Sequence, residues 1–401
     1  MVSTKEYASR RAKVLKKLQG AAGIIFAGVR SGEPEPNWRP HAHFEYLTGI
    51  TNECGAMLLF DSTNSVPARR EVLFLLARDP EVEQWDGIRK PLGSELRHEL
   101  GITTVLRTRT LDTVLADVAS RTKQFATLMP PATIQSPISE DLAMWNKVVE
   151  RSPSCEIVDK SGVIPLLRSV KSAAEIKTIQ EAIDMTTRGF AEALSFMKPG
   201  VNEFQVQATL EYGYAMAGAR GSAFPPIVGG GLNSTVLHYN ANDQELVSGD
   251  LVCIDSGAFH AGYGADISRT IPVSGKFTKR QKEIYEIVLK AEDAAIKAVK
   301  PGVTLGELDS IARAIIVKAG FGDFFIHGIG HHLGLETHDN CGPMAPLKKG
   351  AVVTIEPGIY LPDEALGIRI EDDIAVTANG HKNLSKSIPK TVQAIEKAMR
   401  G

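Results

Sequence analysis

The sequence lacks three features that would assign a chain to a class at once: paired cysteines, a long apolar run and an excess of one charge. Its four cysteines, Cys54, Cys155, Cys253 and Cys341, lie far apart without a Cys-x-x-Cys pair, which argues against structural zinc and a disulfide framework. No stretch approaches the ~18 consecutive apolar residues of a membrane span. The net charge of −2 gives no reason to expect a nucleic-acid or membrane partner.

The N-terminal stretch combines a basic segment with an apolar one, as a signal peptide would. Residues 10–17 contain five lysines and arginines, and residues 20–28 are mostly apolar. The apolar residues in and around the basic segment have helical spacing, however, and the apolar segment is short and interrupted by glycines like a buried strand. We therefore expect an N-terminal helix and strand in a cytoplasmic protein.

Length and composition indicate a globular protein of two domains. The chain has 401 residues, of which 43% are hydrophobic, enough for two cores. Strand-like and helical patterns alternate in its first part, which predicts an α/β domain with a partly parallel sheet. The expected helices are Ser3–Leu18, Leu92–Leu100 and Leu111–Ser120, and the expected strands are Ala22–Ala27, Ala56–Phe60 and Val72–Leu76. The polar and aromatic residues 38–49 are expected to form a surface loop that enters a strand.

The boundary between the domains is predicted near residues 164–169. Ser172 and Glu175 form a capping-box pattern, and apolar residues at helical spacing follow it until Pro199-Gly200 ends the helix. We place the domains at 1–160 and 161–401.

The second domain contains an internal repeat. Lys198-Pro-Gly-Val201 recurs as Lys300-Pro-Gly-Val303, and residues 248–257 are echoed by residues 349–358. The histidines His238 and His338 stand at a similar separation. Two copies are too few, and the period is too long, for a solenoid. We expect two half-domains packed about a pseudo-twofold axis with a site between them.

Three histidines of the second copy, His327, His331 and His338, lie among glycines. Imidazole is both the commonest ligand of divalent metals and the commonest proton shuttle near neutral pH. A zinc-binding helix of the His-Glu-x-x-His type is disfavoured by the glycines and by the absence of Glu directly after His327. A turn with solvated histidines remains the alternative for this stretch alone.

Four carboxylates occupy duplicated positions. Asp255 and Glu356 each end an apolar strand, and Asp266 and Glu371 lie on the acidic strand that follows in each copy. Carboxylates that converge without cations would raise one another's pKa values. A pair of divalent metals, with His331 as the nitrogen ligand, is the simplest neutraliser, and this donor set suits Mn²⁺, Co²⁺, Fe²⁺ or Zn²⁺.

These motifs together resemble the pita-bread metallopeptidases, and within them the proline-specific branch of prolidases and aminopeptidases P. The motifs are Asp255-x-Gly257, Asp266-x-x-Arg269-Thr270, His331-x-x-Gly334-x-x-x-His338, Glu356-Pro-Gly358 and Arg369-x-Glu371. The resemblance covers residues 163–401 and implies a duplicated pita-bread catalytic domain. A looser resemblance of Phe44–Gly49 and Gln84–Gly87 implies a creatinase-like N-terminal domain, so the predicted fold class is α/β (α+β).

The resemblance also implies roles for individual residues. Two metal ions per chain, Mn²⁺ before Co²⁺, Zn²⁺ or Fe²⁺, would be bound by five ligands: Asp255, Asp266, His331, Glu356 and Glu371. His238 and His338 would lie beside the substrate carbonyl and amide. His327 would support the site, and Arg369 would support the metal-bound carboxylates.

The expected reaction is hydrolysis of the bond that precedes proline. A hydroxide bridging the two metals would attack the carbonyl, and His238 or His338 would stabilise the oxyanion and help to protonate the leaving nitrogen. Glu356 would shuttle the proton of the water. A creatinase, or an inactive binding protein on the same fold, is disfavoured because all five ligands are present.

The choice between dipeptidase and aminopeptidase depends on what binds the substrate's C-terminus. A dipeptidase needs a cation for this carboxylate, ideally arginine, and the loop Asp339–Val353 contains lysines but no arginine. Either the enzyme accepts longer peptides, or another group such as Arg39 caps the site. The compact chain and short loop favour an Xaa-Pro dipeptidase, with an Xaa-Pro aminopeptidase as the alternative. Short proline-containing peptides are the expected substrates, and a homodimer the expected assembly.

Overall fold

The computed structural model describes residues 2–30, 38–339 and 345–400. Contacts between residues divide the chain into two compact units, Val2–Arg168 and Ser169–Gly401. Helix α7 (Val163–Arg168) therefore belongs with the first unit, although the predicted boundary places it in the second. Within the described residues, none of the helices combines the length and the apolar character needed to cross a bilayer.

The first unit is built around a six-stranded mixed sheet with the strand order β4-β3-β2-β1-β5-β6. Strand β2 runs antiparallel to β1 and β3, and the outer pairs are parallel. The strands are β1 (Ala22–Phe26), β2 (Met57–Asp61), β3 (Glu71–Leu75), β4 (Thr104–Arg107), β5 (Gln124–Thr127) and β6 (Glu156–Asp159). The helices besides α7 are α1 (Thr4–Leu18), α2 (Ala42–Thr48), α3 (Pro80–Asp86), α4 (Ser94–Leu100), α5 (Leu111–Arg121) and α6 (Glu140–Val149).

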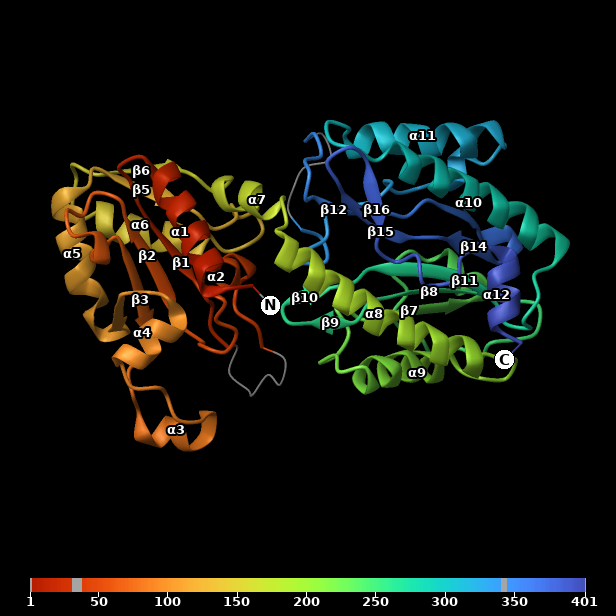
Figure 1. Ribbon diagram of the computed structural model, residues 1–401, viewed down its shortest axis with the longest axis horizontal. Helices are drawn as coiled ribbons and strands as arrows, with labels where there is room; N and C mark the ends of the chain where they lie inside the picture. The colour runs from red at the N-terminus through yellow and green to blue at the C-terminus, as the bar shows by residue number, and fades with distance from the viewer. Residues whose placement is uncertain (1, 31–37, 340–344, 401) are drawn as a thin grey trace. The chain divides into compact units, whose positions relative to one another are not determined.

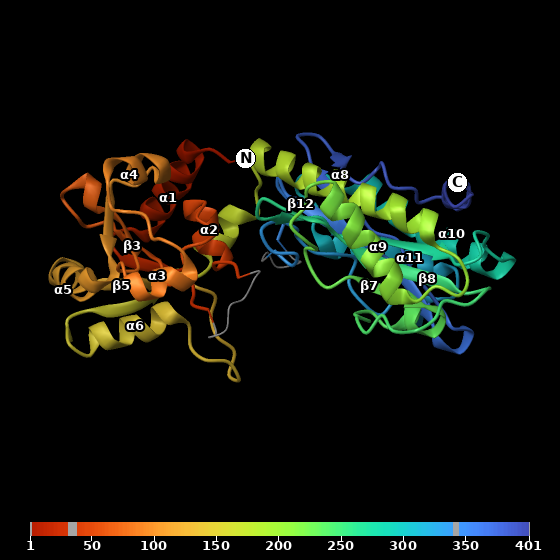
Figure 2. The ribbon, with the colours of Figure 1, turned by 90° about the horizontal axis from the view of Figure 1, so that it is seen from below.

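Helices lie on both sides of this sheet (Figure 2). The central strands are accordingly buried along their whole length, which explains their continuous apolar runs. Ile24 packs on one face in a cluster with Phe125 and Trp145, whose rings stack 4.6 Å apart. The partly parallel α/β sheet predicted for this region is confirmed.

The prediction for residues 38–49 is wrong. They contain α2, all seven residues of which are buried, rather than a surface loop entering a strand. Helical spacing is hidden here because the buried polar side chains have partners within the unit: His43 contacts Arg168 at 2.8 Å, and Glu45 pairs with Arg39 at 2.9 Å. A sequence pattern alone predicts that such polar residues are exposed, and a run of exposed residues without helical spacing indicates a loop.

The second unit consists of two helix pairs with strands between them (Figure 1). Its strands form two three-stranded sheets, β11-β8-β7 and β12-β15-β16, and two hairpins. The helices are α8 (Ala173–Phe196), α9 (Glu203–Met216), α10 (Lys279–Ala298), α11 (Leu305–Lys318) and α12 (Val392–Ala398). The strands are β7 (Ile227–Gly230), β8 (Leu251–Ser256), β9 (Phe259–His260), β10 (Tyr263–Gly264), β11 (Ile267–Pro272), β12 (Val352–Ile355), β13 (Gly358–Leu361), β14 (Leu366–Arg369), β15 (Asp372–Val376) and β16 (His381–Asn383).

The duplication expected from the sequence is visible in local hydrogen bonds. Helices α9 and α11 follow the repeated Lys-Pro-Gly-Val segments, and each begins with a capping box. Leu246 exchanges backbone hydrogen bonds with the residues Gly200 and Val201, and Leu347 does so with Gly302 and Val303. The repeat therefore specifies the same turn, cap and pairing twice, as a pseudo-twofold arrangement requires.

The two copies join along β11 and the β14–β15 segment. The amide of Glu371 donates to the carbonyl of Ser268 at 3.1 Å, and Thr270 exchanges hydrogen bonds with the backbone of Arg369. Strands from different copies that carry acidic residues thus lie side by side. This junction positions the site described next.

Candidate metal centre

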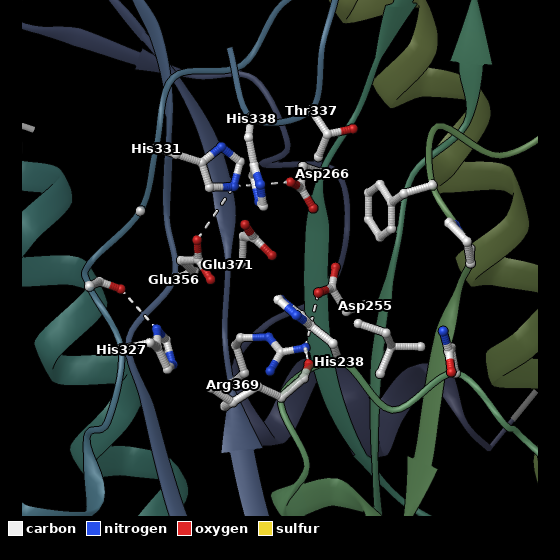
Figure 3. A pocket seen from close by; sticks show the side chains of 17 residues that line it. His238, Asp255, Asp266, His327, His331, Thr337, His338, Glu356, Arg369 and Glu371 are labelled. Atoms are coloured by element: carbon white, nitrogen blue, oxygen red, sulfur yellow. Dashed lines mark hydrogen bonds and ion pairs between the residues drawn. The ribbon is translucent and has the colours of Figure 1, made fainter. Parts of the chain in front are cut away.

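A cavity of about 580 Å³ opens within the second unit and contains the side chains that the sequence singled out. Figure 3 shows Asp255, Asp266, Glu356 and Glu371 directed into one space, with imidazoles around it. Another part of the lining is apolar, made by Phe224, Pro225, Ile227 and Leu237. The cavity therefore combines a concentrated set of charged donors with a surface suited to an apolar side chain.

The four carboxylates come from equivalent strand ends of the two copies. Asp255 lies on β8 and Glu356 directly follows β12, while Asp266 precedes β11 and Glu371 precedes β15. Because alternate residues of a strand share a face, each pair of strands presents its acidic residues toward the same cavity. The structure thus brings together the four acidic residues that the repeat predicted.

His331 lies next to these carboxylates. Its Nε2 is 3.3 Å from Asp266 Oδ2 and 3.6 Å from Glu356 Oε1, and its Nδ1 lies 3.1 Å from the carbonyl of His332. Ligand atoms of Asp266, His331 and Glu371 all lie within 4.8 Å of one another. The stretch around His331 is irregular rather than helical, as its glycines indicated. One nitrogen and several carboxylate oxygens therefore converge at metal-binding distances.

The raised pKa values of the clustered carboxylates indicate that a cation belongs among them. Burial, and then the charge of Asp255, raises the pKa of Asp266 well above its usual value. Burial and the three neighbouring carboxylates do the same to the pKa of Glu371, and burial raises the pKa of Glu356 to about 7. Asp255 Oδ1 is buried and has no hydrogen-bond partner among the described residues. In this cluster the charged forms of the carboxylates are destabilised, and one buried oxygen has no hydrogen-bond partner among the described residues. Such a set of donors fits divalent metal ions.

Arg369, on β14, links the carboxylates of both copies. Its Nη2 donates to Asp255 Oδ2 at 3.0 Å, and its Nε donates to Ser268 Oγ at 2.8 Å. Ser268 Oγ in turn donates to Glu371 Oε2 at 2.8 Å. The arginine therefore orients one predicted ligand directly and a second through a hydroxyl.

The remaining histidines border the cavity in different environments. The ring of His338 contacts that of His331 edge-on at 4.2 Å, and burial, followed by the charges of His331 and His238, lowers the pKa of His338. His238 lies on the opposite side, beside Arg369 in Figure 3. His327 Nε2 is 2.8 Å from the hydroxyl of Tyr360, and burial lowers the pKa of His327 to about 4. All three reach the cavity.

Sequence reasoning missed three polar residues that hold these groups. Ser268 connects Arg369 with Glu371, Thr354 donates to Glu356 at 3.3 Å, and Tyr360 accepts from Arg369 at 3.1 Å. Ser268 and Thr354 stand two residues from a predicted ligand, so strand periodicity could have found them. Tyr360 has no such signal, since it lies in an apolar strand.

Two predictions concern residues outside this geometry. Arg39 pairs with Glu45 within the first unit, and its contact with substrate stays a prediction. The loop Asp339–Val353, whose shortness supported a dipeptidase, includes residues 340–344, which lie outside the described residues, as does Cys341.

Comparison with known proteins extends the likeness to the whole chain. Residues 177–378 match metallopeptidase family M24, and residues 7–127 match the aminopeptidase P N-terminal domain. Xaa-Pro aminopeptidase of Haemophilus influenzae is 32% identical, over 98% of this chain and 97% of that protein. Xaa-Pro dipeptidase of Pyrococcus furiosus is 43% identical, but over 61% of this chain and 71% of that protein.

Solved structures agree with these matches. A variant of Escherichia coli aminopeptidase P in complex with substrate superposes with a TM-score of 0.87 at 31% identity, covering 100% of this chain and 98% of that one. The aminopeptidase P N-terminal domain and the metallopeptidase domain thus follow each other in the order that the sequence predicted. The chain belongs to the pita-bread metallopeptidases of family M24, in their proline-specific branch.

Proposed function

We propose that the protein is an Xaa-Pro aminopeptidase, which removes the first residue from peptides that have proline in second position. The observation that carries this proposal is the full-length likeness to Xaa-Pro aminopeptidases, which includes the N-terminal domain as well as the catalytic one. The likeness to Xaa-Pro dipeptidases, although higher in identity, covers only part of this chain. The preference for a dipeptidase drawn from the compact sequence is therefore replaced by its alternative.

The charge of the cavity supports the same choice. A dipeptidase must bind a carboxylate that lies one residue beyond the scissile bond, and this needs a cation with free donors. Among the described lining residues, Arg369 is the only permanent cation, and its N–H groups face Asp255, Ser268 and Tyr360. A substrate whose chain continues past proline places no charge at that point.

Two divalent ions would be held by Asp255, Asp266, His331, Glu356 and Glu371, with Mn²⁺ as the first choice and Co²⁺, Zn²⁺ or Fe²⁺ as alternatives. When bound, such ions supply Lewis acidity and lower the pKa of water near neutral pH. The oxygen-rich set with a single imidazole suits these ions and does not choose among them.

The side chains around this cluster would bind and orient the peptide. His238 and His338 border the cavity from two sides, where either ring can donate to the oxygen of the scissile carbonyl or to the leaving nitrogen. Arg369 and Ser268 keep Asp255 and Glu371 directed inward. The apolar wall around Phe224 and Ile227 excludes water and offers space to an apolar side chain of the substrate.

A comparison of Xaa-Pro-Yaa tripeptides with the matching Xaa-Pro dipeptides tests the proposal. The full chain should cleave the tripeptides with a kcat/KM at least ~10-fold higher, about the discrimination that one substrate contact provides. Removal of metal with a chelator should stop cleavage of both, and Mn²⁺ should restore it. Preferential cleavage of the dipeptides would establish a dipeptidase instead, and cleavage that survives metal removal would overturn both.

A further inference from the structure

Behind the metal centre, the guanidinium of Arg269 joins three separate segments. This side chain is 1% exposed and all five of its N–H groups donate hydrogen bonds. Two go to the carbonyls of Ser268 and Glu371 at 2.9 and 2.6 Å, and one goes to Asp372 Oδ1 at 2.7 Å. The other two go to the carbonyls of Ile388 and Pro389 at 3.3 and 3.0 Å. Arg269 therefore ties the residues at Glu371 to a segment near the C-terminal end.

A second cation, Lys390, completes this connection. Its Nζ lies 3.0 Å from Asp372 Oδ2, 2.8 Å from Glu292 Oε2 and 3.1 Å from Asp293 Oδ1. Asp372 and Glu292 are fully buried, and Glu292 lies on α10. Although burial alone would raise the pKa of Asp372, the charges of Arg269 and Lys390 hold it below its usual value. The pKa of Glu292 is raised by burial and by the charge of Asp372, so the two cations stabilise the charge of Asp372 in particular.

The segment Asn383–Lys390, here called the C-terminal strap, also bonds directly to β15. Ser385 Oγ donates to Asp372 Oδ1 at 3.0 Å and accepts from the amide of Asp373 at 2.9 Å. Asp373 Oδ2 then accepts from the amide of Asp266 at 3.2 Å. Two of the proposed metal ligands, Asp266 and Glu371, are therefore held through their backbones by groups that the strap supports.

We propose that the C-terminal strap, through Arg269 and Lys390, positions Asp266 and Glu371 for metal binding, so that the order of the strap and the metal affinity are coupled. This inference rests on the metal centre proposed above but not on any peptide specificity. Its physical basis is that ligands lose affinity when the groups that orient them are removed, typically by 10- to 100-fold. Removal of one member of a buried ion pair also leaves the charge of its partner without a counter-charge, which destabilises the arrangement.

Coupling is reciprocal, and so the unmodified protein provides the first test. Metal-free full-length protein is compared with protein saturated with Mn²⁺ by hydrogen–deuterium exchange. Metal binding should slow exchange of the amides of residues 384–388, while helix α6 of the first unit should be unchanged. Equal exchange in the strap with and without Mn²⁺ would overturn the proposal.

A pair of matched lysine variants provides the second test. Lys390→Met removes the half-buried cation that pairs with Asp372 and Glu292, and Lys386→Met removes an exposed cation of the same strap. Calorimetric titration with Mn²⁺ should show at least ~10-fold weaker binding for Lys390→Met, and the affinity of Lys386→Met should equal that of the unmodified protein. Should Lys390→Met not be recovered folded, Glu292→Gln, which weakens the same ion pair, is titrated in its place.

The outcomes separate the two proposals. If the unmodified protein binds none of Mn²⁺, Co²⁺ and Zn²⁺, the proposal of a metal centre is itself wrong. Unchanged affinity in Lys390→Met, together with a lower unfolding temperature of the metal-free protein, would show that the cluster only stabilises the fold. Weaker binding at an unchanged unfolding temperature is a result that a merely structural role would not give.

Discussion

The two copies within the second unit have the same scaffold but make different contributions to the site. The first supplies two aspartates, and the second supplies two glutamates and the histidine His331. His331 bonds the strand residue Thr354, and the equivalent position in the first copy is Gly229, opposite Cys253 on β8. A Cβ at Gly229 would lie 2.7 Å from the carbonyl of Asn233, so that copy has no space for a side chain there. Duplication therefore explains the carboxylates, and a difference at this single position explains why only the second copy places a histidine there.

Each copy also supports the ligand of the other. Ser268, two residues after Asp266, donates to Glu371, and Asp373, two residues after Glu371, accepts from the amide of Asp266. The two supporting residues stand at equivalent positions but differ in chemistry, since Ser268 contributes a hydroxyl and Asp373 a carboxylate. Both hydrogen bonds cross between the copies, in keeping with the position of the site at their junction.

The largest effect is expected from making the second copy resemble the first. His331→Gly removes the proposed nitrogen ligand, and Asp266→Asn removes a carboxylate of the other copy. Either change should reduce kcat/KM for Xaa-Pro-Yaa peptides by more than the ~100-fold that loss of a ligand's supporting group costs. Peptide cleavage and metal content by emission spectrometry measure this, with circular dichroism as the check on folding.

His98→Ala is the matched control, because this histidine is exposed on α4 of the first unit. It should retain full activity and metal content. Near-normal turnover in His331→Gly or Asp266→Asn would rule out a dinuclear centre built from both copies.

A smaller effect is expected from cutting the support between the copies. Ser268→Ala removes the hydroxyl that links Arg369 to Glu371 and leaves all five proposed ligands in place. We expect ~10-fold weaker Mn²⁺ binding, at the low end for loss of a ligand's orienting group. Titration of the metal-free protein measures this, and an affinity equal to that of the unmodified chain would show that contacts other than the Ser268 hydroxyl, such as the hydrogen bond from Arg269 to the Glu371 carbonyl, orient Glu371.

Some residues of the site could be predicted from the sequence and others could not, depending on whether they form a local or repeated pattern. The carboxylates could be predicted because they occur at equivalent positions in both copies, at the ends of strands, where a charged side chain is rarely buried without a partner. Ser268 stands at an unspecified position of the motif Asp266-x-x-Arg269-Thr270 and was given no role, because a hydroxyl in a strand has many ordinary explanations. Helix α2 was missed because its polar residues are buried by partners distant in sequence, such as Arg168 for His43. Such pairs are set by tertiary structure and leave no local pattern.

The copies should also differ in their sensitivity to acid, through His332 of the second. Burial, followed by the charge of Lys171, lowers the pKa of His332 to about 4, against ~6.5 when unfolded. Between these values the unfolded state binds more protons, so stability is complete above pH 6.5 and falls as the pH drops toward 4. At ~1.4 kcal/mol per pH unit below 6.5, His332 accounts for about 2 kcal/mol of the stability lost between pH 7 and pH 5, and His327, whose pKa burial also lowers to about 4, adds to this loss.

Thermal unfolding of the metal-free protein at pH 7 and pH 5 measures this loss. In His332→Gln the decrease in Tm between the two pH values should be smaller by ~4–8 °C, since 1 kcal/mol corresponds to ~2–4 °C in a unit of this size. The exposed His98→Gln should behave as the unmodified protein does. A full decrease in His332→Gln would place the acid-sensitive group elsewhere.

The smallest effect concerns the helix caps that the copies share. Thr304 accepts from the amide of Glu307 at the start of α11, and Thr304→Ala should cost ~1 kcal/mol of stability without changing kcat/KM. Asn202 caps α9 in the same way, but its Nδ2 also donates to the carbonyl of Asp243, in the loop that follows His238. Asn202→Ala should therefore lower both Tm and kcat/KM, as measured by thermal unfolding and cleavage of Xaa-Pro-Yaa peptides. Equal effects of the two changes would mean that the cap in the first copy supports only its helix, and that His238 is positioned by other contacts.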